Sequence, residues 1–424
     1  MKVLLISANT ERIAMTVPPM GLASVAAATQ AAGHDVVMVD LLTAEEAPQS
    51  AIKEAIGPFH PEVIGISVRN IDDQRMEDPK FLLDPVREVV SECRRLSAAP
   101  IVLGGAGFSI FPGSVLAYLG ADMGIQGEGE AAFPALLPLL RGGVAPSGLP
   151  GLYLPAAGMT AKRQFIQDLD SLPFPTRHLQ PLKPEDRDLW IQIQTRRGCP
   201  LGCSYCSTST VEGRSIRKRS PEGVVRQIGE MVQTGFHRFF FVDNTFNLPP
   251  SYAKELCRKI IASGLRIAWL CIVYPRYVDI ELAGLMAKAG CRHISLGFES
   301  GSPPILANMN KRFTLEEVRR IAEMFAAEGI KQQGFLMLGG PGETRETVEQ
   351  SVRFAESLPI EGLKVTTGIR IYPETALARI ARADGTIAPG DDLLQPRFYM
   401  ARALREWLPD RVAHWASSRP QWIL

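Results

Sequence analysis

Three cysteines stand close together near the middle of the chain, at Cys199, Cys203 and Cys206, in a C-x3-C-x2-C spacing. Clustered thiolates favour zinc or an iron–sulfur cluster. A structural zinc site needs four ligands, usually as two paired arms, and no second arm lies nearby in the sequence. An iron–sulfur cube usually takes four cysteines, so three would leave one iron open. The spacing predicts a catalytic iron–sulfur cluster, and the alternative is a disulfide pair or an incidental group of cysteines.

The motif also carries an aromatic residue, Tyr205, directly before its last cysteine. In this it resembles the radical S-adenosylmethionine (SAM) superfamily, in which the three cysteines hold a catalytic [4Fe-4S] cluster. The resemblance implies that SAM binds the open iron through its amino and carboxylate groups, next to Tyr205. One electron from the cluster would then cleave SAM reductively, usually into methionine and a 5′-deoxyadenosyl radical.

Strand-like segments alternate with helical segments from the cysteine region onward. Because parallel barrels collect their active sites at the carboxyl ends of the strands, the cysteine loop should lie at that edge. Together with the resemblance, the pattern predicts a partial (β/α)6 barrel of the TIM type. Its expected strands are residues 191–195, 238–242, 268–273, 293–296, 333–338 and 362–369.

The resemblance also implies SAM or substrate contacts at the ends of four of these strands. The segment G-F-E-S matches the family's G-x-E-S pattern, and G-G-P-G-E-T matches its glycine-rich loop. Asp243 and Asn244 could instead cap the next turn, and Glu343 could cap the following helix. The expected cofactor-binding residues are Asp243, Asn244, Gly297, Glu299, Ser300, Gly339, Gly340, Glu343, Arg370 and Tyr372.

The first third of the chain has its own strand and helix rhythm. Apolar strands are expected at residues 2–8, 36–41, 63–68, 101–103 and 123–126, with helices between them. This alternation predicts an α/β fold with a parallel, doubly wound, Rossmann-like sheet. Ligands of such sheets bind beyond the carboxyl ends of the strands.

Glycines and polar residues at these strand ends resemble the cobalamin-binding domain that precedes many radical SAM domains. The histidine motif D-x-H-x-x-G, which supplies a ligand to cobalt, is missing. The resemblance therefore implies cobalamin without a histidine ligand, and the alternative is a domain that kept the fold and lost the cofactor. The segment 69–73, at a strand end, could lie under the cofactor or be a solvated loop. The expected contacts are Gly21, Ser67, Asn70, Gly104, Gly105, Gly127 and Glu128.

Four regions follow from these patterns. We expect a cobalamin-binding-like domain at 1–142, a Pro- and Gly-rich linker at 143–185, the barrel at 186–375 and a helical extension at 376–424. Tryptophans in the extension suggest packing on the barrel core or a lid over its mouth. The basic run of Arg214, Arg217, Lys218 and Arg219 could hold an anionic group or be a solvated loop.

The composition of the chain narrows its possible partners and cellular location. The net charge of +1 gives no field that would favour nucleic acid, so no nucleic-acid partner is expected. No apolar run approaches the roughly 18 residues of a membrane span. The seven cysteines, without a signal peptide, favour a reducing cytoplasm over a disulfide framework.

The leading functional hypothesis is a cobalamin-dependent radical SAM methyltransferase. It would abstract hydrogen from a small-molecule substrate and pass it a methyl group from methylcobalamin, using an electron donor such as flavodoxin or ferredoxin. A second hypothesis keeps the radical SAM core but transfers an aminocarboxypropyl group, or performs a cyclisation or rearrangement. A third is a non-enzymatic redox or cobalamin sensor that uses the cluster as a switch.

Overall fold

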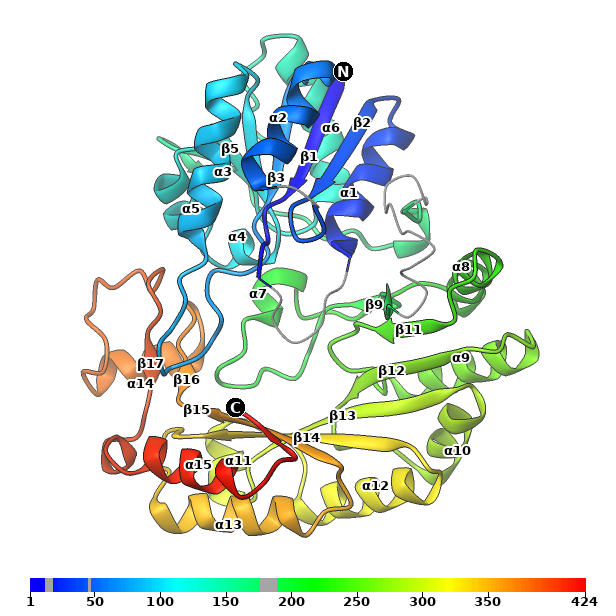
Figure 1. Ribbon diagram of the computed structural model, residues 1–424, viewed down its shortest axis with the longest axis vertical. Coiled ribbons are helices and arrows are strands. Elements are labelled where there is room, and N and C mark those ends of the chain that lie inside the picture. The colour runs from blue at the N-terminus through cyan, green and yellow to red at the C-terminus, as the bar shows by residue number, and fades with distance from the viewer. Residues whose placement is uncertain (12–17, 45–46, 176–188) are drawn as a thin grey trace.

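The structure is a computed structural model that describes residues 1–11, 18–44, 47–175 and 189–424. Two α/β domains follow one another, each built on a seven-stranded sheet. Figure 1 shows the N-terminal sheet and its helices above, the second sheet below, and α7 (Thr208–Glu212) and β9 (Arg196–Arg197) between them. The expected Rossmann-like domain and partial barrel are confirmed. Part of the expected linker, residues 176–188, lies outside the described residues.

The N-terminal sheet has the strand order β2-β1-β3-β4-β5-β6-β7. Strands β1 to β5 run parallel, whereas β6 and β7 are antiparallel additions beside β5. The sheet therefore extends past residue 142 into the expected linker region. Its strands are β1 (Lys2–Ser7), β2 (Asp35–Asp40), β3 (Val63–Ser67), β4 (Ile101–Gly104), β5 (Met123–Ile125), β6 (Leu152–Leu154) and β7 (Gly158–Met159).

Both faces of this sheet are covered, because successive apolar residues of β1 point to opposite sides. Val3 and Leu5 pack into one buried cluster with α1 and α6, and Leu4 and Ile6 pack into another with α2, α3 and α5. At Gly65 on β3 a Cβ would lie 2.5 Å from Leu5 Cδ2, so the sheet needs glycine there. The helices are α1 (Met20–Ala31), α2 (Pro48–Phe59), α3 (Leu83–Leu96), α4 (Ala106–Ile110), α5 (Pro112–Leu119) and α6 (Gly129–Arg141).

The second sheet is entirely parallel, in the order β18-β15-β14-β13-β12-β11-β8. Six of its strands are the six that the sequence predicts. Short pairs β9–β10 and β16–β17 form beside the sheet. The strands are β8 (Ile191–Ile193), β10 (Arg217–Lys218), β11 (Arg238–Phe241), β12 (Ala268–Val273), β13 (Cys291–Glu299), β14 (Lys331–Leu338), β15 (Gly362–Thr367), β16 (Ile369–Arg370), β17 (Phe398–Tyr399) and β18 (Trp422–Ile423).

Helices of the second domain begin at well-defined caps. Ser220 accepts a hydrogen bond from Gly223 N ahead of Pro221, and Thr314 and Thr344 each form a capping box. Such caps fix where each helix leaves the preceding strand end. The helices are α8 (Pro221–Gln233), α9 (Pro250–Ala262), α10 (Ile280–Lys288), α11 (Pro303–Asn308), α12 (Leu315–Ala327), α13 (Arg345–Glu356), α14 (Ala376–Ala383) and α15 (Leu408–Ser417).

The C-terminal extension packs on the barrel and adds to its sheet. Strand β18 pairs in parallel with β15, with Trp422 beside Leu363. Trp415 and Trp422 are buried in the same apolar cluster as the barrel strands. Of the two expectations for this segment, core packing agrees with the structure. The pairing of β18 was not predicted.

One apolar cluster spans both domains. Ile64 and Leu103 of the N-terminal sheet share it with Ile369, Leu377 and Leu394 from the end of the barrel and the extension. The shared core holds the carboxyl edge of the N-terminal sheet over the barrel (Figure 1). Within the described ranges, every helix is too short or too polar to cross a lipid bilayer.

Candidate active site

The three cysteines lie in the loop between β9 and α7, at the interface of the domains (Figure 1). Cys199 N donates to Gly213 O at 3.0 Å, which closes this loop on itself. At Gly198 the backbone has φ +92°, and a Cβ would lie 2.1 Å from Ser215 O, so only glycine fits before the first cysteine. The loop is therefore fixed by its backbone before any ligand binds.

Burial governs the thiols of this loop. Burial, with smaller contributions from the neighbouring Cys206 and Cys203, raises the pKa of Cys199 to about 11. Burial also raises the pKa of Cys203, against the opposing effect of Lys311. Such thiols become thiolates readily only when a metal centre takes their charge.

The chemistry of this donor set fits a cluster with one open iron. The other four cysteines are buried, and all seven are free of disulfides, which excludes the disulfide alternative. Among the described residues no three His, Cys, Asp or Glu side chains are arranged to hold a single metal ion. A cube spreads its thiolates over separate irons, so three thiols from one loop suit it better than a single ion.

Glu299 and Lys311 form a buried ion pair beside the cysteine loop. The Lys311 Nζ to Glu299 Oε1 distance is 3.3 Å, and Nζ lies 5.3 Å from the centre of the Tyr205 ring. Glu299 ends β13 with φ +62°, a conformation that a non-glycine residue adopts only at some cost. A Cβ at Gly297 would lie 3.2 Å from Glu299 Oε1, so the preceding glycine makes room for this carboxylate.

The glycine-rich loop after β14 is held by its own glutamate. Glu343 Oε2 accepts from Gly339 N at 2.5 Å and from Gly340 N at 2.9 Å. Burial raises the pKa of Glu343 to about 7, although both amides oppose the shift. Gly339 has φ +97°, and a Cβ there would meet Met400 Sδ at 2.6 Å. Glu343 thus shapes this loop from within and does not cap α13, whose N-cap is Thr344.

Asp243 and Ser300, two of the residues expected to contact cofactors, are engaged by the protein itself. Asp243 is fully buried and accepts from Thr195 N at 2.8 Å and Arg196 N at 3.0 Å, which anchors the end of β8. The Ser300 hydroxyl lies 3.0 Å from Ser351 Oγ. For Asp243 and Ser300 the structure supports a structural role, because their polar atoms point into the barrel wall.

Arg370 also has a structural place, between the two domains. Its Nε donates to Asp72 Oδ2 at 2.7 Å, and its other nitrogens donate to Ile371 O, Leu393 O and Leu394 O. Both charged side chains are buried. The guanidinium is thus occupied by the carboxylate and three carbonyls, and the expected cofactor contact of Arg370 stays a prediction.

Tyr372 and Asn244 lie nearer the cysteine loop. The Tyr372 ring stands 6.2 Å from that of Phe111, and its pKa is raised mainly by burial, with a smaller effect from Cys206. Asn244 Nδ2 donates to Glu212 Oε2 at 2.6 Å. Their contact with a cofactor stays a proposal.

A cavity of about 290 Å³ opens at the carboxyl edge of the N-terminal sheet. A Cβ added at Gly21 or Gly104 would meet no atom within 4 Å, so both glycines leave free space there. The described lining contains no histidine. Asn70 lies instead along a small separate hollow, while its neighbour Arg69 reaches the cavity. The other expected contacts line it: Gly21, Ser67, Gly104, Gly105, Gly127 and Glu128.

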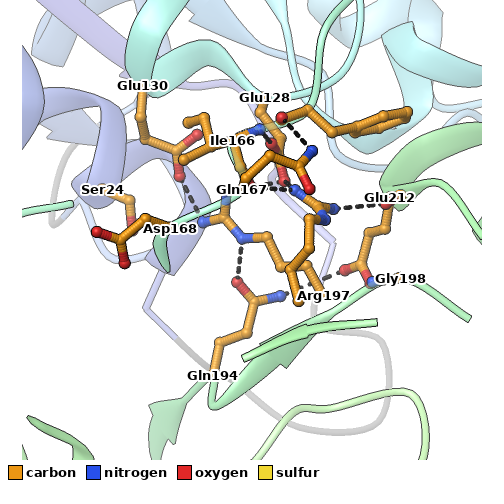
Figure 2. A network of polar contacts seen from close by, with 12 residues as sticks. Ser24, Glu128, Glu130, Ile166, Gln167, Asp168, Gln194, Arg197, Gly198 and Glu212 are labelled. Carbon is orange, nitrogen blue, oxygen red and sulfur yellow. Dashed lines mark hydrogen bonds and ion pairs between the residues drawn. The ribbon is translucent and has the colours of Figure 1, made fainter. Parts of the chain in front are cut away.

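A buried polar network joins this cavity to the cysteine loop (Figure 2). Arg197 donates to Glu130 Oε1 at 2.5 Å and to Gln194 Oε1 at 2.8 Å, and pairs with Glu128 at 3.3 Å. Glu128 accepts from Arg217 at 2.6 Å. Part of the basic run after the cysteines is therefore structural, and not a solvated loop.

Glu212 completes the network on the side of the cysteines. Its Oε2 accepts from Gly198 N at 3.0 Å, and its Oε1 accepts from Gln194 Nε2 at 3.2 Å. Burial raises the pKa of Glu212, although the Gly198 amide and Arg197 oppose this. Glu212 and Arg197 both line the cavity, so the residues that flank the cysteine loop on either side form part of the cavity floor.

Comparison with known proteins agrees with the division of the chain into two domains. The model of the radical SAM superfamily matches residues 193–355, and that of the B12 binding domain matches residues 6–137. This chain belongs to the radical SAM superfamily. Its radical SAM domain contains the cysteine loop, and its B12 binding domain supplies most of the cavity lining. The cofactors of this enzyme are thus a [4Fe-4S] cluster, SAM and cobalamin.

Full-length relatives share both domains of this radical SAM enzyme. An uncharacterized methyltransferase of Pyrococcus horikoshii is 29% identical over 91% of this chain and 84% of its own. Tryptophan 2-C-methyltransferase of Streptomyces laurentii is 25% identical over 88% of this chain and 73% of its own. The solved structure of the methyltransferase TsrM from Kitasatospora setae, with cobalamin and a [4Fe-4S] cluster bound, aligns with a TM-score of 0.89. It is 22% identical and covers 100% of this chain and 90% of its own, which shows a common fold.

Proposed function

We propose that this radical SAM enzyme transfers a methyl group to a carbon atom of a small organic substrate. The observation that carries the proposal is the shared wall between the cofactor cavity and the cysteine loop. Arg197 and Glu212 line the cavity, and Glu212 accepts a hydrogen bond from Gly198 N at the start of the cysteine loop, so a ligand in the cavity is one hydrogen-bonded layer from the loop that would hold the cluster. When bound, cobalamin supplies a methyl group carried on cobalt, and the cluster supplies one electron for the cleavage of SAM.

The protein residues bind and orient these cofactors. Glycines at the strand ends leave space for a large ligand, and the buried pairs of Arg197 and Arg217 fix the floor beneath it. The relatives that support methyl transfer are named tryptophan 2-C-methyltransferase, cytidylyl-2-hydroxyethylphosphonate methyltransferase and hopanoid C-3 methylase. Their different substrates support a small molecule as the class, without choosing one. An electron donor such as flavodoxin or ferredoxin, and a cytoplasmic location, belong to the same proposal.

The test is anaerobic reconstitution with iron, sulfide and cobalamin, followed by mass spectrometry of the products from SAM. S-adenosylhomocysteine is what remains when SAM gives up its methyl group, so we expect it to form only in cobalamin-loaded protein. Methylthioadenosine in its place would overturn the proposal in favour of aminocarboxypropyl transfer. No cleavage of SAM with dithionite would instead favour a sensor.

Two variants separate the roles of the cofactors. Gly104→Leu projects into free space in the cavity and should abolish corrinoid binding and S-adenosylhomocysteine formation while keeping the cluster absorbance. Gly57→Leu, on the exposed face of α2, is its matched control, because a Cβ there also meets no atom within 4 Å. Replacing Cys199, Cys203 and Cys206 together by Ala should abolish the cluster, and iron retained by that variant would refute its assignment.

A further inference from the structure

The turn that follows α11 docks onto the middle of the cysteine motif. Asn310 Nδ2 donates to Gly202 O at 2.7 Å, and Ser204 N donates to Met309 O at 3.1 Å. Asn310 takes the left-handed conformation, with φ +55°, to make this contact. The turn therefore fixes the backbone on both sides of Cys203.

Lys311, the next residue of this turn, places its ammonium against the cysteine motif, with Nζ 5.3 Å from the centre of the Tyr205 ring, two residues after Cys203. Its side chain is only 5% exposed, and its ion pair with Glu299 is the described partner at 3.3 Å. Burial disfavours the charge of Lys311, and the carboxylate of Glu299 compensates it. An ammonium so deeply buried is costly to maintain, and nothing in the cysteine motif itself requires it.

A positive charge at Lys311 would act on the reduction potential of the cluster. Reducing an iron–sulfur cluster adds one negative charge to a centre that already carries thiolates. Net charge and the groups around the sulfurs set its reduction potential. A fixed positive charge beside one thiolate stabilises the reduced state, and the carboxylate of Glu299 partly offsets that effect.

We propose that Lys311 is a positioning residue that makes the cluster easier to reduce by holding a permanent positive charge beside Cys203. The inference rests on the cluster alone and needs neither SAM nor methyl transfer. It can therefore fail while the proposed function stands, and the reverse also holds.

The test is a redox titration of the reconstituted full-length protein without SAM, followed by electron paramagnetic resonance, with iron content measured in parallel. K311M removes the charge and nearly keeps the length, whereas K311R keeps the charge. K259M is the control. Lys259 lies on the outer helix α9, its side chain is 46% exposed, and it pairs with a glutamate, Glu222 of α8, as Lys311 does. At the wild-type midpoint the ratio of reduced to oxidised cluster should fall about tenfold in K311M, equal to about 59 mV for one electron. In K311R and K259M the same ratio should change by less than about threefold.

An unchanged ratio in iron-loaded K311M would overturn the proposal, as would equal falls in K311M and K311R. E299Q gives a second arm if K311M does not hold iron. Removing the negative charge of Glu299 leaves the ammonium of Lys311 uncompensated, so the ratio should rise by about threefold or more. No rise in iron-loaded E299Q would overturn the proposal whatever K311M shows.

Discussion

Glu343 should make the stability of the fold depend on pH in a direction opposite to that of most carboxylates. The side chain is 3% exposed, and its Oε2 accepts from two amides of the glycine-rich loop. Its Oε1 has no partner among the described residues. Burial raises its pKa to about 7, from 4.5 in a solvated carboxyl. The folded protein therefore holds a proton on Glu343 at pH values where the unfolded chain has lost it.

The sign and size of the effect follow from this difference. Because the folded pKa is the higher one, the stability contributed by protonated Glu343 is fully present below pH 4.5 and is lost as the pH rises through 7. Each pKa unit corresponds to about 1.4 kcal/mol. Ionising Glu343 in the folded protein should therefore cost about 3 kcal/mol. Glu343→Gln keeps an oxygen acceptor for the two amides and cannot ionise.

The assay is urea unfolding of wild type and Glu343→Gln at pH 4.5 and pH 8, followed by tryptophan fluorescence and circular dichroism together. The variant should match wild type at pH 4.5 and have a free energy of unfolding about 3 kcal/mol higher at pH 8. Glu323→Gln is the control, because this exposed residue on α12 lies outside the glycine-rich loop and its loss should keep the wild-type pH dependence. If the difference between wild type and Glu343→Gln were the same at both pH values, the reasoning would be refuted.

Two further substitutions test how the domains and the cavity are held. Arg370→Leu leaves Asp72 buried and unpaired, so urea unfolding should show a loss of about 3–5 kcal/mol, and adding Asp72→Leu should restore much of it. Failure of the double variant to recover would contradict this account. Gly105→Ala should lower the melting temperature, because Gly105 has φ +97° and a Cβ would lie 2.6 Å from Val68 O, whereas Gly104→Ala should leave it unchanged.

The architecture was predictable because each strand and helix has a signal in its own local sequence. Apolar runs of about five residues, each followed by glycine or a polar residue, predict parallel strands that end at a site. The cysteine spacing is equally local, since its three ligands come from one loop. The cavity was expected at the carboxyl edge of the N-terminal sheet for the same reason, and the structure has it there.

Contacts between distant residues were not predictable in this way. Asp72 and Arg370 are 298 positions apart, and no local sequence pattern around either residue predicts the other as its partner. Asp243 was expected to face a cofactor because it ends a strand, but a buried carboxylate can equally satisfy the amides of the strand beside it. Only the three-dimensional fold decides between these uses of the same residue.

Lys311 is a residue of the site that the sequence did not single out, and Glu212 is another. Lys311 follows a short helix in an ordinary polar turn, and a lysine there is usually solvated. The signal that could have found it is its place between the G-F-E-S segment and the glycine-rich loop, two motifs that meet at the same edge of the barrel. The two-residue β18 was missed because so short a strand carries no periodicity.

The apolar cluster shared by both domains has a consequence for the design of chimeras. Ile369 from the end of the barrel and Leu377 from the extension are buried with Ile64 and Leu103 of the B12 binding domain. Cutting the chain between the two sheets would expose apolar surface on both pieces. A graft that exchanges the first domain for that of a relative must therefore carry residues 369–399 with it. Each domain of this enzyme is contiguous in sequence, but the set of residues that a chimera must exchange is not.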